Sequence, residues 1–93
     1  MLIRKTDTNH KEIINKCRQV PALSVFSTHT LGKGFPDIVI GYKGKNYLFE
    51  IKDGNKTKSQ VKLTEDESIF HRNWRGQVTI VYSFEDILQV INE

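Results

Sequence analysis

The chain contains a single cysteine, Cys17, and no apolar run that approaches the length needed to span a bilayer. One cysteine cannot close an internal disulfide, and a lone thiol fits a reducing cytoplasm. No charged-then-apolar signal segment stands at its start, and the sequence has no repeats, low-complexity segments or linkers. These features predict a cytoplasmic domain that neither crosses a membrane nor depends on disulfides.

Histidine is also scarce, and its spacing argues against a zinc site. His10, His29 and His71 lack the paired cysteines that such a site usually has. His10 stands two residues before Glu12 and is a candidate phosphate contact, although a histidine on the surface of a helix is the more ordinary interpretation. Cys17 has no catalytic partner in the sequence and is most simply a small buried apolar residue.

The residues that are present fit one small folded domain over positions 1–93. The 93 residues are 38% hydrophobic, and five Phe, three Tyr and one Trp supply aromatic side chains for a core. A domain of this size buries only a modest core and is marginally stable alone. We therefore expect a homodimer.

Positive charge is concentrated in the first two thirds of the chain. Residues 1–62 hold 12 Lys and Arg against 5 Asp and Glu, whereas residues 63–93 hold 2 against 6, so the net charges are +7 and −4. A basic patch is the electrostatic footprint of nucleic-acid binding. The alternative is an ordinary basic surface exposed to solvent. We disfavour it because the excess of basic residues surrounds carboxylates that are expected to be buried.

Hydrophobic periodicity and turn-forming residues predict the secondary structure. Helices are expected over about 9–19, from 65 to about 75 and from 84 onward, with strands over 22–27, 37–42, 46–52 and 77–82 and a loop over 53–62. The order α-β-β-β-α-β-α predicts an α/β fold in which helices flank a mixed sheet. The strand–helix–strand step should be a right-handed crossover, which makes the last strand parallel to its neighbour.

Two short stretches carry the chemistry of the sequence, Gly34-Phe35-Pro36-Asp37 and Glu50-Ile51-Lys52. Glu50 and Lys52 share a face because side chains alternate along a strand. A two-residue turn at 43–44 would place Asp37 opposite Glu50, and one at 44–45 would place it opposite Lys52. A turn centred on the glycine alone, or a bulge beside Pro36, would send Asp37 elsewhere.

If the three side chains meet, they suit metal-assisted cleavage of a phosphodiester. Asp37 and Glu50 would each give an oxygen to a divalent cation, and the carbonyl of Ile51 could give a third. Lys52 would neutralise charge on the phosphate or orient the attacking water. In the competing interpretation, Glu50 and Lys52 are solvent-facing strand residues and Asp37 merely follows a turn proline.

Pro36-Asp37 followed by Glu50-Ile51-Lys52 matches the signature of the PD-(D/E)XK nucleases. More specifically, the chain resembles the small stand-alone VRR-NUC (virus-type replication-repair nuclease) proteins of phages and bacteria. The resemblance covers nearly the whole chain, through the stretches 7–9, 34–42, 47–54, 62–64, 70–71 and 74–78 together with Glu12 and Ser83.

The resemblance implies a PD-(D/E)XK nuclease-like α/β core and cleavage of DNA that depends on Mg²⁺ or Mn²⁺. Asp37, Glu50 and Lys52 would be the catalytic residues, and the substrate would be branched or structured DNA such as a Holliday junction. It also implies a homodimer with two active sites, in the cytoplasm of a bacterial cell or a phage-infected host. A nicking endonuclease on linear duplex, or a structure-specific DNA-binding module that does not cut, are the alternatives.

Two acidic positions have competing interpretations. Glu12 matches the family's first-helix glutamate, which sits near the metal, but an acid is also favoured in the first turn of any helix. The family's glutamine in the helix after the active strand has no counterpart in 65–68, and Gln60 does not clearly align with it. Thr64 and Glu67 are instead a capping box, which we favour over a second metal site.

Candidate DNA contacts lie in two loops. Lys56 and Lys58 follow the active strand and could reach backbone phosphates. Lys33 stands between two glycines, so 32–34 either allows the backbone to approach DNA near the metal or is an ordinary flexible loop.

Overall fold

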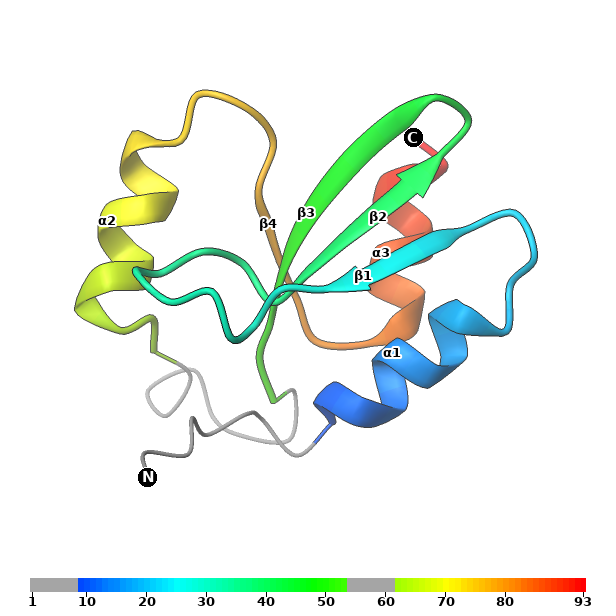
Figure 1. Cartoon of the computed structure of the whole chain (residues 1–93), viewed down its shortest axis with the longest axis horizontal. Helices are drawn as coiled ribbons and strands as arrows, with labels where there is room; N and C mark the ends of the chain where they lie inside the picture. Colours follow the sequence, from blue (N-terminus) through cyan, green and yellow to red (C-terminus); the bar gives the residue numbers. More distant parts are fainter. Residues whose placement is uncertain (1–8, 54–61) are drawn as a thin grey trace.

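A computed structural model describes residues 9–53 and 62–93 (Figure 1). The elements follow in the order α1 (His10–Arg18), β1 (Ser24–Ser27), β2 (Ile38–Tyr42), β3 (Lys45–Ile51), α2 (Glu65–Asn73), β4 (Thr79–Val81) and α3 (Phe84–Ile91). This is the predicted order, although β1 and β4 are shorter than expected. Most of the predicted loop over 53–62 lies outside the described residues. Within the described ranges, no helix is long and apolar enough to cross a membrane.

The four strands form one mixed sheet in the order β1-β2-β3-β4. β1 pairs with β2 and β2 with β3 in antiparallel fashion, whereas β4 runs parallel to β3. The predicted mixed α/β fold, including the parallel final pair, is therefore confirmed.

The β2–β3 hairpin turns at Lys43 and Gly44, the first of the two predicted registers. Tyr42 pairs with Lys45, and the two turn residues have φ of 50° and 78°. Positive φ at both central positions matches the twist of a two-residue hairpin, which is why glycine is favoured there. The register ends at the pair Ile38 and Phe49, and the amide of Asp37 donates to the carbonyl of that same Phe49. Asp37 therefore lies just outside the regular pairing, at the end of β3 and next to the Glu50 side chain.

The hydrophobic core lies between the sheet and the pair α1 and α3 (Figure 1). The strand residues that point to this face are at most 1% exposed: Ile38, Ile40, Phe49, Ile51 and Val81. Cys17 of α1 is fully buried in this core and forms no disulfide. Burial raises the pKa of its thiol to about 11, so the prediction that Cys17 is a small apolar core residue is confirmed.

α2 lies apart from the other two helices, against the segment between β1 and β2 (Figure 1). Phe35 from that segment packs edge-on against Phe70 with 5.4 Å between ring centroids, and Trp74 stacks on Phe70 at 4.9 Å. Gly34 has φ of 79°, and a Cβ there would collide with the backbone carbonyl of Asp66. A glycine at this position lets the segment before Asp37 dock directly on the first turn of α2.

Candidate active site

Asp37 and Glu50 lie beside one another across the β2–β3 hairpin. The amide of Asp37 donates to the carbonyl of Phe49 at 3.0 Å. Its carboxylate Oδ2 accepts from the amide of Ile51 at 2.7 Å. These two bonds hold Asp37 against the end of β3, so the predicted convergence of Asp37 and Glu50 is confirmed.

Glu50 is almost fully withdrawn from water, with 2% of its surface exposed. Its Oε1 has no hydrogen-bond partner among the described residues. Burial, then the hydrogen bond and charge of Asp37, and lastly the neighbouring Glu67 raise the pKa of Glu50 to about 10. Two carboxyl groups in one desolvated site resist ionising together unless a cation compensates them.

Lys52 is fixed at both its backbone and its side chain. Its amide donates to the carbonyl of Val81 at 3.0 Å, and its own carbonyl accepts from Asn9 Nδ2 at 2.9 Å. The Nζ donates to Glu67 Oε1 at 2.9 Å and lies 3.8 Å from Glu50 Oε2. Only 12% of the side chain is exposed. The interpretation of Glu50 and Lys52 as solvent-facing strand residues is therefore wrong.

Glu67 belongs to this cluster, although its spacing from Thr64 predicts only a helix cap. The capping box with Thr64 is present, and the Glu67 Oε1 that accepts from the Thr64 amide also accepts from Lys52 Nζ. Burial alone would raise the pKa of this carboxyl, but the bonds from Thr64 and Lys52 outweigh it and lower the pKa. Glutamate at the third helical position is the signature of a capping box. Nothing else in the sequence indicated that Glu67 would also contact Lys52.

One turn further along α2, His71 lies close enough to Glu67 and Lys52 to feel both charges. Burial lowers the pKa of its imidazole, Glu67 opposes that shift and Lys52 adds to it. The Nε2 is buried without a hydrogen-bond partner among the described residues. His71 therefore favours the neutral form beside this cluster.

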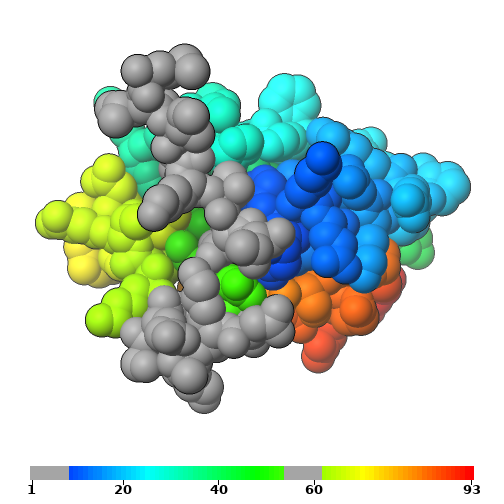
Figure 2. Space-filling model, turned by 90° about the horizontal axis from the view of Figure 1, so that it is seen from below, coloured from blue at the N-terminus to red at the C-terminus, as the bar shows by residue number. Residues whose placement is uncertain are grey.

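Lys52 and Glu67 border a surface hollow of about 380 Å³. The exposed Lys33 lines the same hollow, together with Gly32, Gly34, Thr64 and Asp66. Seen from below, the end of β3 reaches the surface between α1 and α2 (Figure 2). The hollow gives a ligand access to the Lys52 ammonium. Lys33 lies at the edge of this hollow, where a phosphate could reach it. Gly34, by contrast, is buried against α2.

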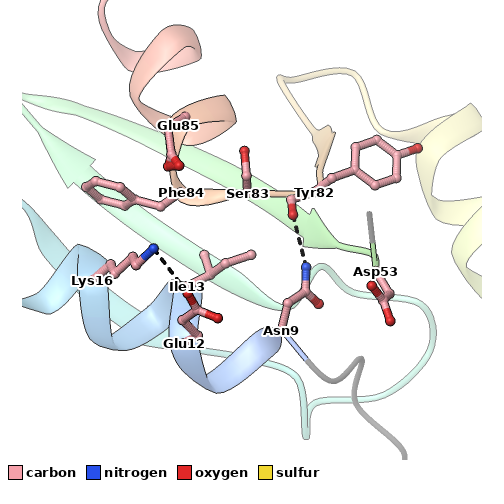
Figure 3. Close-up of a pocket in the computed structure, with 9 residues that line it drawn as sticks. All are labelled: Asn9, Glu12, Ile13, Lys16, Asp53, Tyr82, Ser83, Phe84 and Glu85. Atoms are coloured by element: carbon pink, nitrogen blue, oxygen red, sulfur yellow. Dashed lines mark hydrogen bonds and ion pairs between the residues drawn. The ribbon is translucent and has the colours of Figure 1, made fainter. Parts of the chain in front are cut away.

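Glu12 lies elsewhere, in a separate hollow of about 210 Å³ between α1 and α3 (Figure 3). Its side chain is 67% exposed and forms an ion pair of 3.1 Å with Lys16 Nζ. In the same hollow, Asn9 donates to the carbonyl of Tyr82 (Figure 3). Within 9–53 and 62–93, no three His, Cys, Asp or Glu residues gather as a metal site. Glu12 is thus not brought to Asp37 and Glu50 as a third acidic ligand.

The remaining predicted contacts differ in their outcome. His10 is 6% exposed, and its ring packs edge-on against His29 with 5.0 Å between centroids. The expectation of a surface histidine is wrong, and the buried ring is not placed to contact a phosphate because α1 turns it inward. Lys56 and Lys58, like Gln60, lie outside the described residues.

Comparison of the chain with protein-family models, with curated proteins and with solved structures finds no match. A function for this chain is therefore inferred from its own residues and their geometry.

Proposed function

We propose that the chain is a metal-dependent DNA endonuclease of the PD-(D/E)XK type, acting on branched or structured DNA such as Holliday junctions. The observation that carries this proposal is the meeting of Asp37 and Glu50 at the end of one hairpin, with Lys52 one residue beyond the strand that holds Glu50. All three groups are largely withdrawn from water. Desolvation strengthens electrostatic interactions with a reacting phosphate.

The donor set fits Mg²⁺ or Mn²⁺. Magnesium is usually held by one or two carboxylates while it keeps several waters and binds substrate phosphates, so two acids suffice. Asp37 and Glu50 are the residues that would hold it, with the carbonyl of Ile51 as a third oxygen. The buried Glu50 Oε1 without a partner among the described residues supports the fit. A bound divalent cation would polarise a phosphoryl oxygen and lower the pKa of a bound water.

Lys52 would complete the site by facing the substrate. Its ammonium borders the 380 Å³ hollow and is fixed by Glu67. A positive charge held at this point can neutralise a phosphate oxygen or orient a water molecule for attack.

A polyanionic substrate agrees with the charge of the chain. The excess of Lys and Arg falls in residues 1–62, which contain Asp37, Glu50 and Lys52, and Lys33 lines the hollow beside Lys52. Basic side chains around a nuclease site steer and position the DNA backbone. We further propose that the protein acts as a homodimer in a reducing cytoplasm, so that two sites address two strands.

The test is a panel of end-labelled four-way junctions, flaps and linear duplexes, incubated with the purified protein and either Mg²⁺ or Mn²⁺. The proposal predicts cleavage that requires the cation and is strongest on branched substrates. Cleavage of linear duplex alone would instead indicate a nicking enzyme. Tight binding of junctions without cleavage under either cation would indicate a recognition module and overturn the proposal.

A further inference from the structure

The Lys52 ammonium stands between the carboxylates of Glu50 and Glu67 and is hydrogen-bonded only to that of Glu67. It donates to Glu67 Oε1 at 2.9 Å, while Glu50 Oε2 lies at 3.8 Å, beyond hydrogen-bond distance. Glu50 is thus within ion-pair distance of this ammonium but not hydrogen-bonded to it. An ammonium in a site with 12% side-chain exposure cannot turn fully to water, so loss of the bond to Glu67 would favour its approach to Glu50.

Glu67 is held in place by α2, independently of Lys52. The amide of Thr64 donates to Glu67 Oε1 at 2.9 Å, and the amide of Glu67 donates to Thr64 Oγ1 at 3.1 Å. Gly34 packs directly on the backbone of this turn. Because both ends of Glu67 are fixed by the helix start, Glu67 acts as the anchor and the flexible lysine follows it.

We propose that Glu67 is a positioning residue that holds the Lys52 ammonium away from Glu50 and so leaves the Glu50 carboxylate open to a divalent cation. This inference rests on the proposed function, because it assigns Glu67 a task within the same site. It separates the two acids of the cluster by role. Glu50 binds the cation, and Glu67 acts on the cation only through Lys52.

Binding of Mn²⁺ without DNA tests the proposal without relying on activity. Free Mn²⁺ is followed by electron paramagnetic resonance during titration of the protein. Glu67→Ala should weaken Mn²⁺ binding about tenfold, as is typical when a partner of a ligand is removed. Glu67→Gln, which keeps the length and the helix cap, should weaken it in the same direction.

The same substitution in a Lys52→Met background isolates the route of the effect. In the absence of the Lys52 ammonium, Glu67→Ala should change Mn²⁺ affinity by less than about twofold, because Glu67 affects the cation only through Lys52. An equal loss of affinity in both backgrounds would mean that Glu67 acts through its own charge, and would overturn the proposal. Glu65→Ala is the matched control, since it removes an exposed acid from the same first turn of α2 and leaves both bonds to Glu67 Oε1 in place, and it should bind Mn²⁺ normally.

A measurement without any metal keeps this inference separable from the proposed function. The ¹⁵N-labelled Lys52 ammonium should give a resolved, slowly exchanging resonance in the unsubstituted protein and in Glu65→Ala. Glu67→Ala should abolish that resonance while circular dichroism shows an intact fold. A resonance unchanged by Glu67→Ala would refute the anchoring role even if DNA is cleaved. Failure of the unsubstituted protein to bind Mn²⁺ would refute the metal site, with the anchor still decided by the resonance.

Discussion

Asp37 Oδ2 accepts a 2.7 Å hydrogen bond from the amide of Ile51, the residue between Glu50 and Lys52. The Asp37 carboxylate therefore links the start of β2 to the end of β3 and also lies beside Glu50. The contact ties the geometry of the proposed cation site to the backbone of β3, so the position of Asp37 does not depend on a flexible side chain alone.

This double role predicts different consequences for two substitutions of Asp37. Asp37→Asn keeps an oxygen for the Ile51 amide, whereas Asp37→Ala leaves that donor without its acceptor. The free energy of unfolding should fall by about 1 to 3 kcal/mol more for Asp37→Ala than for Asp37→Asn. Urea denaturation of the two variants without metal checks this, and equal stabilities would show that the bond to Ile51 contributes little.

Glu50→Gln should stabilise the metal-free protein. The carboxyl is buried beside Asp37 and Glu67, and its pKa is raised to about 10 from the ordinary value of 4.5. Between those two values the folded state binds more protons than the unfolded chain, so the Glu50 contribution makes stability fall as pH rises. The glutamine amide cannot ionise, so the substitution removes this destabilising contribution of the carboxyl. The free energy of unfolding at pH 7 should therefore rise by about 1 to 3 kcal/mol.

Urea denaturation at pH 5, 7 and 9 tests this pH dependence. The decline in stability with rising pH should be shallower in Glu50→Gln than in the unsubstituted protein. A variant that is less stable than the unsubstituted protein at every pH would show that the carboxyl stabilises the fold.

Gly34→Ala should be more harmful than Gly32→Ala in the same segment. Both glycines have φ near 80°, but only at Gly34 would a Cβ meet another part of the chain, the backbone of Asp66 and Glu67. Strain at positive φ is common to both, so the difference reports the collision with α2, which we expect to cost a further ~1 to 3 kcal/mol. Thermal unfolding measures the difference, and equal losses in the two variants would contradict the close docking of α2.

Glu12→Gln should have little effect on cleavage. The exposed carboxylate forms an i,i+4 pair with Lys16, and such pairs contribute only about 0.3–0.5 kcal/mol. Lys16→Met is the matched control, because it breaks the same pair from the other side. If Glu12→Gln removed cleavage while Lys16→Met did not, α1 would have to supply a group to the active site.

The sequence predicted the parts of the site that depend on local rules. Alternation along a strand predicted that Glu50 and Lys52 share a face, and the Lys43–Gly44 turn gave a hairpin whose open end holds Asp37 next to Glu50. Both rules act within one hairpin, where few arrangements compete. The order of elements followed in the same way from periodicity and turn residues.

The parts that were missed depend on how separate elements dock. Glu67 reaches Lys52 only because α2 packs beside the end of β3, and no local pattern encodes that distance. The side chain of Asn9 makes no cap bond to α1 and donates instead to the carbonyls of Lys52 and Tyr82, which are distant in the sequence. His10 was expected at the surface, yet the packing of α1 turns it toward His29.

The most direct test of the central claim is cleavage of a labelled four-way junction in Mn²⁺ by the unsubstituted protein, Asp37→Asn and the surface control Glu93→Gln. Our account predicts that Asp37→Asn remains folded but loses at least about 100-fold in cleavage rate, as expected when a cation ligand is removed. Glu93→Gln should cut like the unsubstituted protein. Undiminished cleavage by folded Asp37→Asn would contradict the assignment of the site.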